Sequence, residues 1–289
     1  MFYLALSVVC SVIVSILLKL ARRYDVELLP AVAWNYVAAA CLTLLFFRPD
    51  MGSVKIVNTP WPFYLALAVL LPGIFVAVGQ AVRYAGIVRT DVAQRMSLLI
   101  SLTAAFVLFR EAMSAQKGFG IALGFVAIFC CIGWQKKSET SEDRFSWLYL
   151  LLVFIGYGLI DICLKQISQA KTVNFAQSLL IMFLAAGSVA WLAWGRELIA
   201  KRSQFNLRNS GGGLLLGAFN FGNILFYVRG HQALPENPAL VFLSMNIGVI
   251  VLGTLVGVAL FREKLSKINM LGIALAMVAV YILFRDLLA

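Results

Sequence analysis

Charged side chains are scarce in this sequence. Only 13% of its 289 residues are Asp, Glu, Lys or Arg, whereas 62% are hydrophobic, and the mean hydropathy is +0.92. A soluble domain carries about a quarter charged residues. The composition therefore excludes a surface that is solvated by water over most of its area, and we expect most of this surface to face lipid.

Several kinds of functional site are also excluded by what is missing. The five cysteines each lie inside an apolar run, without metal-ligand spacing or a disulfide framework. There is one histidine and no GxxxxGK[ST] nucleotide loop. We therefore expect no metal, no cofactor and no ATP hydrolysis by this chain. A membrane-embedded transferase is disfavoured as well, because the apolar runs hold no acid pair and no His/Asp motif.

The net charge of +11 does not indicate a nucleic-acid partner. The Lys and Arg residues are scattered between apolar runs and form no basic stripe with interleaved aromatics. They are better explained as residues that flank helices in a membrane and set its topology.

The apolar runs have the length of membrane-spanning helices. A spanning helix needs about 20 mostly apolar residues, and the first run lacks the basic flank of a cleaved signal peptide, so we expect it to be retained. The sequence predicts ten transmembrane helices, at 2–20, 30–47, 63–83, 91–109, 116–134, 146–166, 174–195, 211–230, 239–261 and 267–285.

An internal repeat relates the two halves of the chain. FREAMSAQKGFGIALGFVA at 109–127 and FREKLSKINMLGIALAMVA at 261–279 share ten of 19 residues without a gap. The sequence therefore predicts a five-helix repeat at 1–135, a polar linker at 136–144 and a second repeat at 145–289. Because five is odd, the second repeat crosses the membrane in the opposite sense, and such inverted repeats are typical of secondary transporters.

These features resemble the drug/metabolite transporter superfamily, EamA type. The resemblance rests on the five-plus-five helices and on a Glu that ends the fourth and ninth helices, although Arg110 and Arg262 stand where members usually carry Gly. It implies alternating access through a central cavity lined by the first, third, fourth, sixth, eighth and ninth helices. It also implies export of an amino acid, metabolite or drug-like molecule and a bacterial inner membrane. A channel or a non-transporting scaffold is the alternative, and a homodimer through the fifth and tenth helices is a further expectation.

The sequence leaves the orientation open. Of the 24 Lys and Arg residues, 16 lie in or beside the connections after odd-numbered helices. The positive-inside rule would place those connections in the cytoplasm and both termini outside. The resemblance implies cytoplasmic termini instead.

The clearest polar stripe lies in the predicted helix at 211–230. Asn220, Asn223 and Tyr227 share one face at helical spacing, and His231 continues it. Polar groups inside a bilayer are functional candidates by default. We expect this face to line the cavity; the alternative is an interhelical hydrogen-bond clamp. His231 is a candidate for proton coupling or for the interface.

The fourth and ninth helices add a second group of candidates. Arg95 could bind a carboxylate or phosphate, or it could extend to the interface while paired with Asp91. The repeat relates Gln94 to Asn246, so the two amides could face each other across the pseudo-twofold axis. Ser244 lies beside Asn246 and completes this substrate-binding set.

An acid and a lysine stand one turn apart in the sixth helix. Asp161 and Lys165 are predicted either to form a local ion pair, which is favoured, or to leave Asp161 as a protonatable coupling site. Asn35, between Trp34 and Tyr36, lies either in an interfacial aromatic belt, which is favoured, or in the binding site.

Two matched pairs lie at helix ends. Gln80 and Gln232 are candidates for gating or packing. Glu111 and Glu263 are predicted to be structural, with a neighbouring Arg or a helix N-terminus compensating their charge.

Overall fold

The computed structural model describes residues 2–24, 26–53, 59–85, 87–131, 146–170, 173–261 and 267–288. These residues form helices and connections and contain no strand. The elements are α1 (Phe2–Arg23), α2 (Leu28–Phe47), the 3-10 turn η1 (Met51–Ser53), α3 (Trp61–Ala85), α4 (Ile87–Met96), α5 (Leu98–Val107), α6 (Ala115–Cys131), α7 (Ser146–Ser168), α8 (Phe175–Ile199), α9 (Leu207–Ala233), α10 (Pro238–Phe261) and α11 (Lys267–Leu288).

All ten predicted segments are helical, but the fourth was wrong as a single helix. It consists of α4 and α5, which are separated by a turn at Ser97. The Ser97 hydroxyl donates to the Gln94 carbonyl at 2.6 Å, which satisfies a backbone acceptor at the break. The predicted linker at 136–144 and Glu263 lie outside the described residues.

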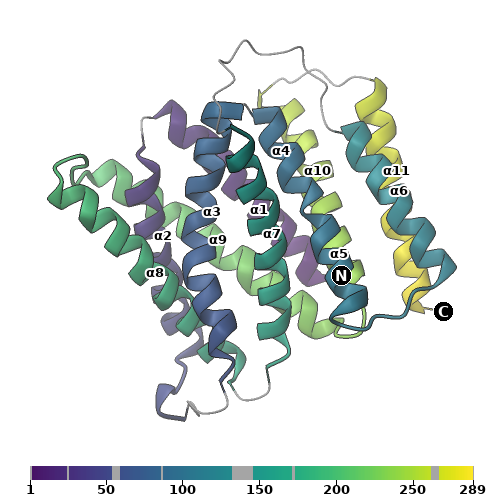
Figure 1. Ribbon diagram of the computed structural model, residues 1–289, viewed down its shortest axis with the longest axis horizontal. Helices are drawn as coiled ribbons and strands as arrows, with labels where there is room; N and C mark the ends of the chain where they lie inside the picture. Colours follow the sequence, from purple (N-terminus) through teal and green to yellow (C-terminus); the bar gives the residue numbers. More distant parts are fainter. Residues whose placement is uncertain are drawn as a thin grey trace.

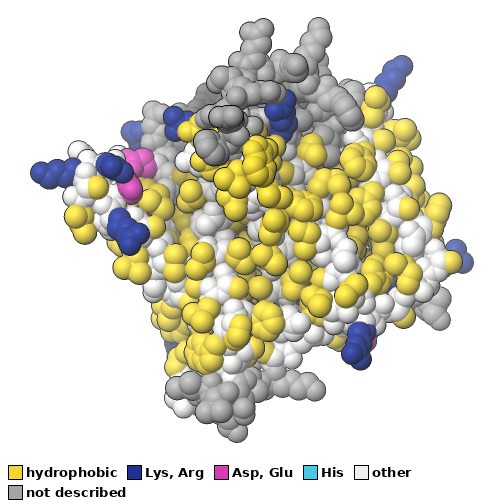
Figure 2. Space-filling model, in the orientation of Figure 1, with side chains coloured by type: hydrophobic (Ala, Val, Ile, Leu, Met, Phe, Trp, Pro, Cys, Tyr) yellow, Lys and Arg dark blue, Asp and Glu magenta, His cyan; other side chains and the backbone are white. Residues whose placement is uncertain are grey.

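Ten apolar helical stretches fit a membrane protein. Six helices are long and apolar enough to span a bilayer, and four shorter apolar helices accompany them, one of them running through the α4–α5 turn. Large apolar side chains such as Phe46, Leu192 and Val107 are exposed. Figure 2 shows apolar side chains over most of the visible face, with Lys and Arg gathered toward its edges. That surface suits lipid rather than water.

Glycines allow the closest helix contact, between α2 and α9. A Cβ at Gly217 would lie 2.3 Å from the Asn35 carbonyl oxygen, and one at Gly213 would lie 2.5 Å from the Ala31 carbonyl oxygen. Any larger residue at these two positions would push the helices apart. The glycines therefore set the distance at which the polar faces of α2 and α9 meet.

The outer helices α6 and α11 lie side by side at one edge of the bundle (Figure 1). A Cβ at Gly120 would meet Leu283 of α11 at 2.9 Å, and one at Gly124 would meet Leu243 of α10 at 3.0 Å. The small-residue motif of α6 thus packs inside the chain. The homodimer through α6 and α11 stays a prediction.

Two helix pairs have the symmetry that the predicted repeat implies. α3 packs along α7, and α1 packs along α9, which are equivalent pairs when the two halves are swapped. Both termini lie at the same end of the bundle (Figure 1). The boundaries of the two repeats and the orientation in the membrane stay predictions.

Candidate functional site

Asp161 of α7 lies at the junction of three helices. Ser101 of α5 donates its hydroxyl hydrogen to Asp161 Oδ2 at 2.7 Å, and Tyr227 of α9 donates to Oδ1 at 2.9 Å. Both carboxylate oxygens therefore have a neutral hydroxyl donor. No Lys or Arg in the described part of the chain forms an ion pair with Asp161, which leaves its negative charge unbalanced inside an apolar helix.

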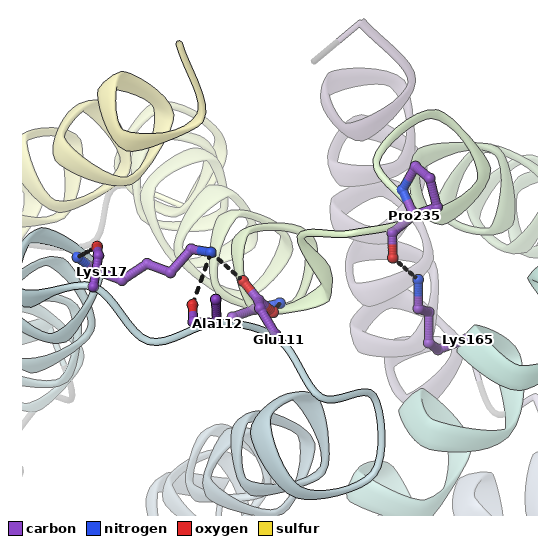
Figure 3. Close-up of polar contacts among 7 residues, drawn as sticks. Glu111, Ala112, Lys117, Lys165 and Pro235 are labelled. Atoms are coloured by element: carbon purple, nitrogen blue, oxygen red, sulfur yellow. Dashed lines mark hydrogen bonds and ion pairs between the residues drawn. The ribbon is translucent and has the colours of Figure 1, made fainter. Parts of the chain in front are cut away.

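The favoured ion pair between Asp161 and Lys165 was wrong. Lys165 is completely buried, but its ammonium donates to the Pro235 carbonyl at 2.7 Å (Figure 3). The ammonium also lies 5.7 Å from the centre of the Phe109 ring. Pro235 follows the last turn of α9, where carbonyl groups lack helical partners and favour a cation. Lys165 therefore holds the end of α9 instead of neutralising Asp161.

Glu111 holds the start of α10 at the same turn. Its Oε2 accepts the Ala239 backbone N–H at 2.8 Å, and its Oε1 lies 2.9 Å from the ammonium of Lys117 (Figure 3). Lys117 also donates to the Ala112 carbonyl at 3.3 Å. The compensation predicted for Glu111 comes from a helix N-terminus and a lysine. Arg110 does not supply it; that residue is exposed and has a positive φ of 54°.

His231 lies one turn beyond Tyr227 on α9 and is completely buried. Its ring packs edge-on against Tyr227 and Phe242, each at 4.9 Å between ring centres. Neither ring nitrogen has a hydrogen-bond partner among the described residues. Lys165 is close enough to interact with it electrostatically. His231 is thus a buried group between Asp161 and the α9–α10 turn, and the interfacial alternative does not fit its burial.

Asn35 and Tyr36 are buried among the helices, and the interfacial-belt interpretation stays a prediction for both. Their exposed fractions are 0% and 1%. Neither the Asn35 amide nor the Tyr36 hydroxyl has a hydrogen-bond partner in the described structure. Trp34 is half-buried and packs on Trp191 with ring centres 5.4 Å apart.

Asn220 faces the same contact from α9. It is 6% exposed and its amide nitrogen has no partner in the described structure. It lies one turn after Gly217, which touches the Asn35 backbone, so the two amides are presented by facing helices. The Tyr36 hydroxyl is within electrostatic range of Tyr157 on α7. Buried polar groups of this kind are normally hydrogen-bonded, and their lack of partners indicates a place where a ligand or water binds.

Asn223 forms an interhelical hydrogen-bond clamp, the alternative to lining the cavity. Ser7 of α1 donates to both the carbonyl oxygen and the Oδ1 of Asn223, at 2.9 Å each. This residue joins α1 to α9 and is thereby separated in role from Asn220, its neighbour on the stripe.

The remaining candidates are less closely grouped. Asn246 donates to the Phe242 carbonyl of its own helix at 3.0 Å, and no hydrogen bond joins it to Gln94 among the described residues. Ser244 is 7% exposed and its hydroxyl has no partner there. Three others are half-buried, and none of them contacts Asp161 in the described hydrogen bonds: Arg95 on α4, Gln80 on α3 and Gln232 near the end of α9.

A surface pocket lies at some distance along the chain from the predicted site residues. It has a volume of about 560 Å³, is lined by Glu27 and by 201–207, at the connection between α8 and α9, and contains no predicted site residue. No group of three or more His, Cys, Asp or Glu among the described residues could hold a metal ion. The arrangement offers hydrogen bonds and one charge to a small molecule.

Sequence reasoning missed Ser101 as the partner of Asp161 and the Pro235 carbonyl as the partner of Lys165. Ser101 is a polar residue in an otherwise apolar run, which is a weak signal. Pro235 offers only a backbone atom, for which the sequence carries no signal.

Comparison with known proteins identifies the family. The EamA-like transporter family model matches residues 1–133, which hold the first predicted repeat. The chain belongs to the EamA-like transporter family. It is therefore an integral membrane protein, and the family indicates a transporter of small solutes.

Two relatives extend the likeness to the whole chain. A protein of Haemophilus influenzae, described as uncharacterized, is 38% identical over 98% of both chains. A solved crystal structure aligns with a TM-score of 0.71 at 16% identity, covering 97% of this chain and 96% of that one. At that identity the second likeness shows the fold alone.

Proposed function

We propose that this EamA-family protein is a secondary transporter that exports a small polar solute by alternating access. Its binding site lies where α2, α7 and α9 meet, in a bacterial inner membrane. The observation that carries this proposal is the pair of buried amides, Asn35 and Asn220, which have no hydrogen-bond partner in the described structure. An unpaired polar group in an apolar environment costs several kcal/mol. A solute that hydrogen-bonds to both amides would remove this cost.

The helices that carry the site support the alternating-access mechanism. α2 belongs to the first predicted repeat, whereas α7 and α9 belong to the second. A relative movement of the two repeats would open the α2–α9 contact to one side of the membrane and then to the other. The glycines at 213 and 217 provide a smooth surface for that movement.

The test is flux in proteoliposomes that contain the purified full chain. A panel of amines, amino acids, nucleosides and drug-like solutes is offered with and without a pH gradient. We expect saturable flux of at least one class. Linear, unsaturable flux would instead favour a channel, and no flux for any class would contradict the proposal.

Two variants connect the flux to the site. Asn35→Ala and Asn220→Ala should each lower kcat/KM severalfold, up to about tenfold, because each removes a hydrogen bond worth about 0.5–1.5 kcal/mol for a neutral pair. Gln204→Ala, in an exposed connection, is the matched control and should transport normally. Unchanged kinetics in both site variants would remove α2 and α9 from the binding site.

A further inference from the structure

The charge of Asp161 has no protein counter-charge, although the helix supplies a lysine one turn away. Among the described residues, its oxygens accept hydrogen bonds from Ser101 and Tyr227, and its side chain is half-buried. Both carboxylate oxygens therefore accept hydrogen bonds. An ionised carboxylate among apolar helices is nevertheless strongly unfavourable without a cation. A proton or a cationic ligand is required to balance it.

Lys165 binds another group and therefore does not supply the positive charge that Asp161 requires. Its ammonium binds the Pro235 carbonyl and lies within electrostatic range of two acids, Glu111 and Glu236. The ammonium is thereby held by a backbone carbonyl at the α9–α10 turn (Figure 3). The local geometry separates a lysine and an acid that the sequence places in reach of each other.

The surroundings of Asp161 favour a cation with a polar end. Tyr157 stands one turn earlier on α7, and Tyr227 contacts the carboxylate directly. Aromatic rings attract cations through their electron-rich faces. The unpartnered amides of Asn35 and Asn220 provide hydrogen bonds for the remainder of a solute. A negatively charged group would instead meet Asp161 with nothing to offset the repulsion.

The predicted repeat indicates one such site per chain. At the shifts that align the repeats, 146 for α7 and 152 for the later helices, Asp161, Tyr227 and Ser101 correspond to Ser15, Phe75 and Gly253. Ser15 carries a hydroxyl, but none of the three matched residues carries a carboxylate. The chain therefore offers one negative charge to a solute in each transport cycle.

We propose that the solute is a cation bearing a protonated amine, and that Asp161 is its counter-charge. This inference rests on the proposed transport function. The carboxyl group holds a proton when the solute is absent. The ammonium group then replaces that proton, so that each amine bound as R–NH₃⁺ releases one H⁺ from the Asp161 carboxyl, and the net charge of the site stays at zero.

Other titratable and charged groups stand on the elements that pack around Asp161, and a pH effect must be separated from them. They are Tyr157 and Lys165 on α7, Tyr227 and His231 on α9, Arg95 on α4, and Glu111 and Glu236 at the connections near Lys165. The Asp161→Asn variant neutralises Asp161 and leaves these other groups in place, so a pH effect that it removes belongs to Asp161.

The experiment uses solutes that share a skeleton and differ in charge. Tyramine, tyrosol and 4-hydroxyphenylacetate form one such set, and ethanolamine, ethylene glycol and glycolate form another. The same amine, alcohol and acid forms are prepared for any solute that the flux panel shows to be carried. Binding to the full chain in detergent is measured as a rise in Tm, and proton release is measured with a pH dye in weak buffer.

We expect the amine form of a carried skeleton to raise Tm and to release a proton, and the alcohol and acid forms to do neither. Asp161→Asn should abolish both signals, and Asp161→Glu should keep proton release at reduced affinity. Glu197→Gln, which neutralises a half-buried acid of α8, should behave as the natural protein.

Two outcomes would overturn the inference while the transport function survives. One is a carried solute whose alcohol or acid form binds at least as well as its amine. The other is amine binding that persists unchanged in Asp161→Asn. The absence of flux and of binding for every charge form would contradict the transport function itself.

Discussion

Two acids in this bundle, the buried Glu111 and the half-buried Asp161, have opposite surroundings. Glu111 is 7% exposed and is held by Lys117 and by the Ala239 N–H at the start of α10. Asp161 accepts hydrogen bonds from Ser101 and Tyr227, and no Lys or Arg of the described residues pairs with it. One acid has its charge matched by a cation and a helix N-terminus, and the other has no charged partner.

The difference separates a structural role from a functional one. An acid whose charge is matched within the chain stabilises the conformation in which the match exists. An acid without a matching charge weakens the folded state unless something from outside balances it, and such groups occur where function requires them. Glu111 therefore belongs to the framework at the α9–α10 turn, and Asp161 belongs to the transport site.

The largest expected effect on stability comes from Glu111→Ala. It leaves Lys117 with a buried uncompensated charge and removes the cap of α10, and breaking one partner of a buried pair costs about 3–5 kcal/mol. We expect a clear fall in Tm for the purified chain in detergent. The double variant Glu111→Gln with Lys117→Met should recover part of the loss, and a Tm equal to the natural protein in Glu111→Ala would contradict the structural role.

Lys165→Met should have the next largest effect. A hydrogen bond to a charged group contributes about 1.5–3 kcal/mol, so the loss of the Pro235 contact should lower Tm by less than Glu111→Ala does. Because Lys165 does not neutralise Asp161, adding Asp161→Asn should leave the Lys165→Met deficit in place. Recovery of the natural Tm in the double variant would mean that the two residues form an ion pair after all.

Tyr227→Phe should lower Tm by less than Glu111→Ala or Lys165→Met does. It removes one of the two hydroxyl donors to Asp161, and a single hydrogen bond contributes about 1 kcal/mol. We expect little change in Tm and a severalfold rise in KM for the carried solute at constant protein amount. Equal KM values in the two proteins would show that the Tyr227 hydroxyl does not position Asp161.

Ser101→Ala should be the mildest of these changes, since Tyr227 still holds the other carboxylate oxygen. Flux in proteoliposomes should fall by less than in Tyr227→Phe. A loss of flux as complete as in Asp161→Asn would assign Ser101 a direct role in solute binding.

Much of the fold was predictable because the signals were local. Apolar runs of spanning length locate the helices, and all ten predicted segments are helical. The turn at Ser97 was not predictable, because it interrupts a run that is apolar on both sides and its hydrogen bond uses a backbone carbonyl. Serine side chains of this kind carry little positional information.

The site was partly predictable for the same reason. Helical spacing correctly grouped Asn220 and Tyr227 on one buried face of α9, and its position well within an apolar run made Asp161 a candidate. The distribution of partners was not predictable. Lys165 is four residues from Asp161, so a local rule favours the pair, but the ammonium turns to a carbonyl 70 residues away. Tertiary contacts overruled the local ion pair that the sequence favoured.

The most direct measurement compares stability and flux for Asp161→Asn in one preparation. Because the Asp161 carboxyl holds a proton when the solute is absent, the neutral Asn should leave the Tm equal to that of the natural protein, while saturable flux of the carried solute in proteoliposomes should disappear. A variant that transports the solute at the natural rate, or one that unfolds as readily as Glu111→Ala, would contradict the assignment of Asp161 to the transport site.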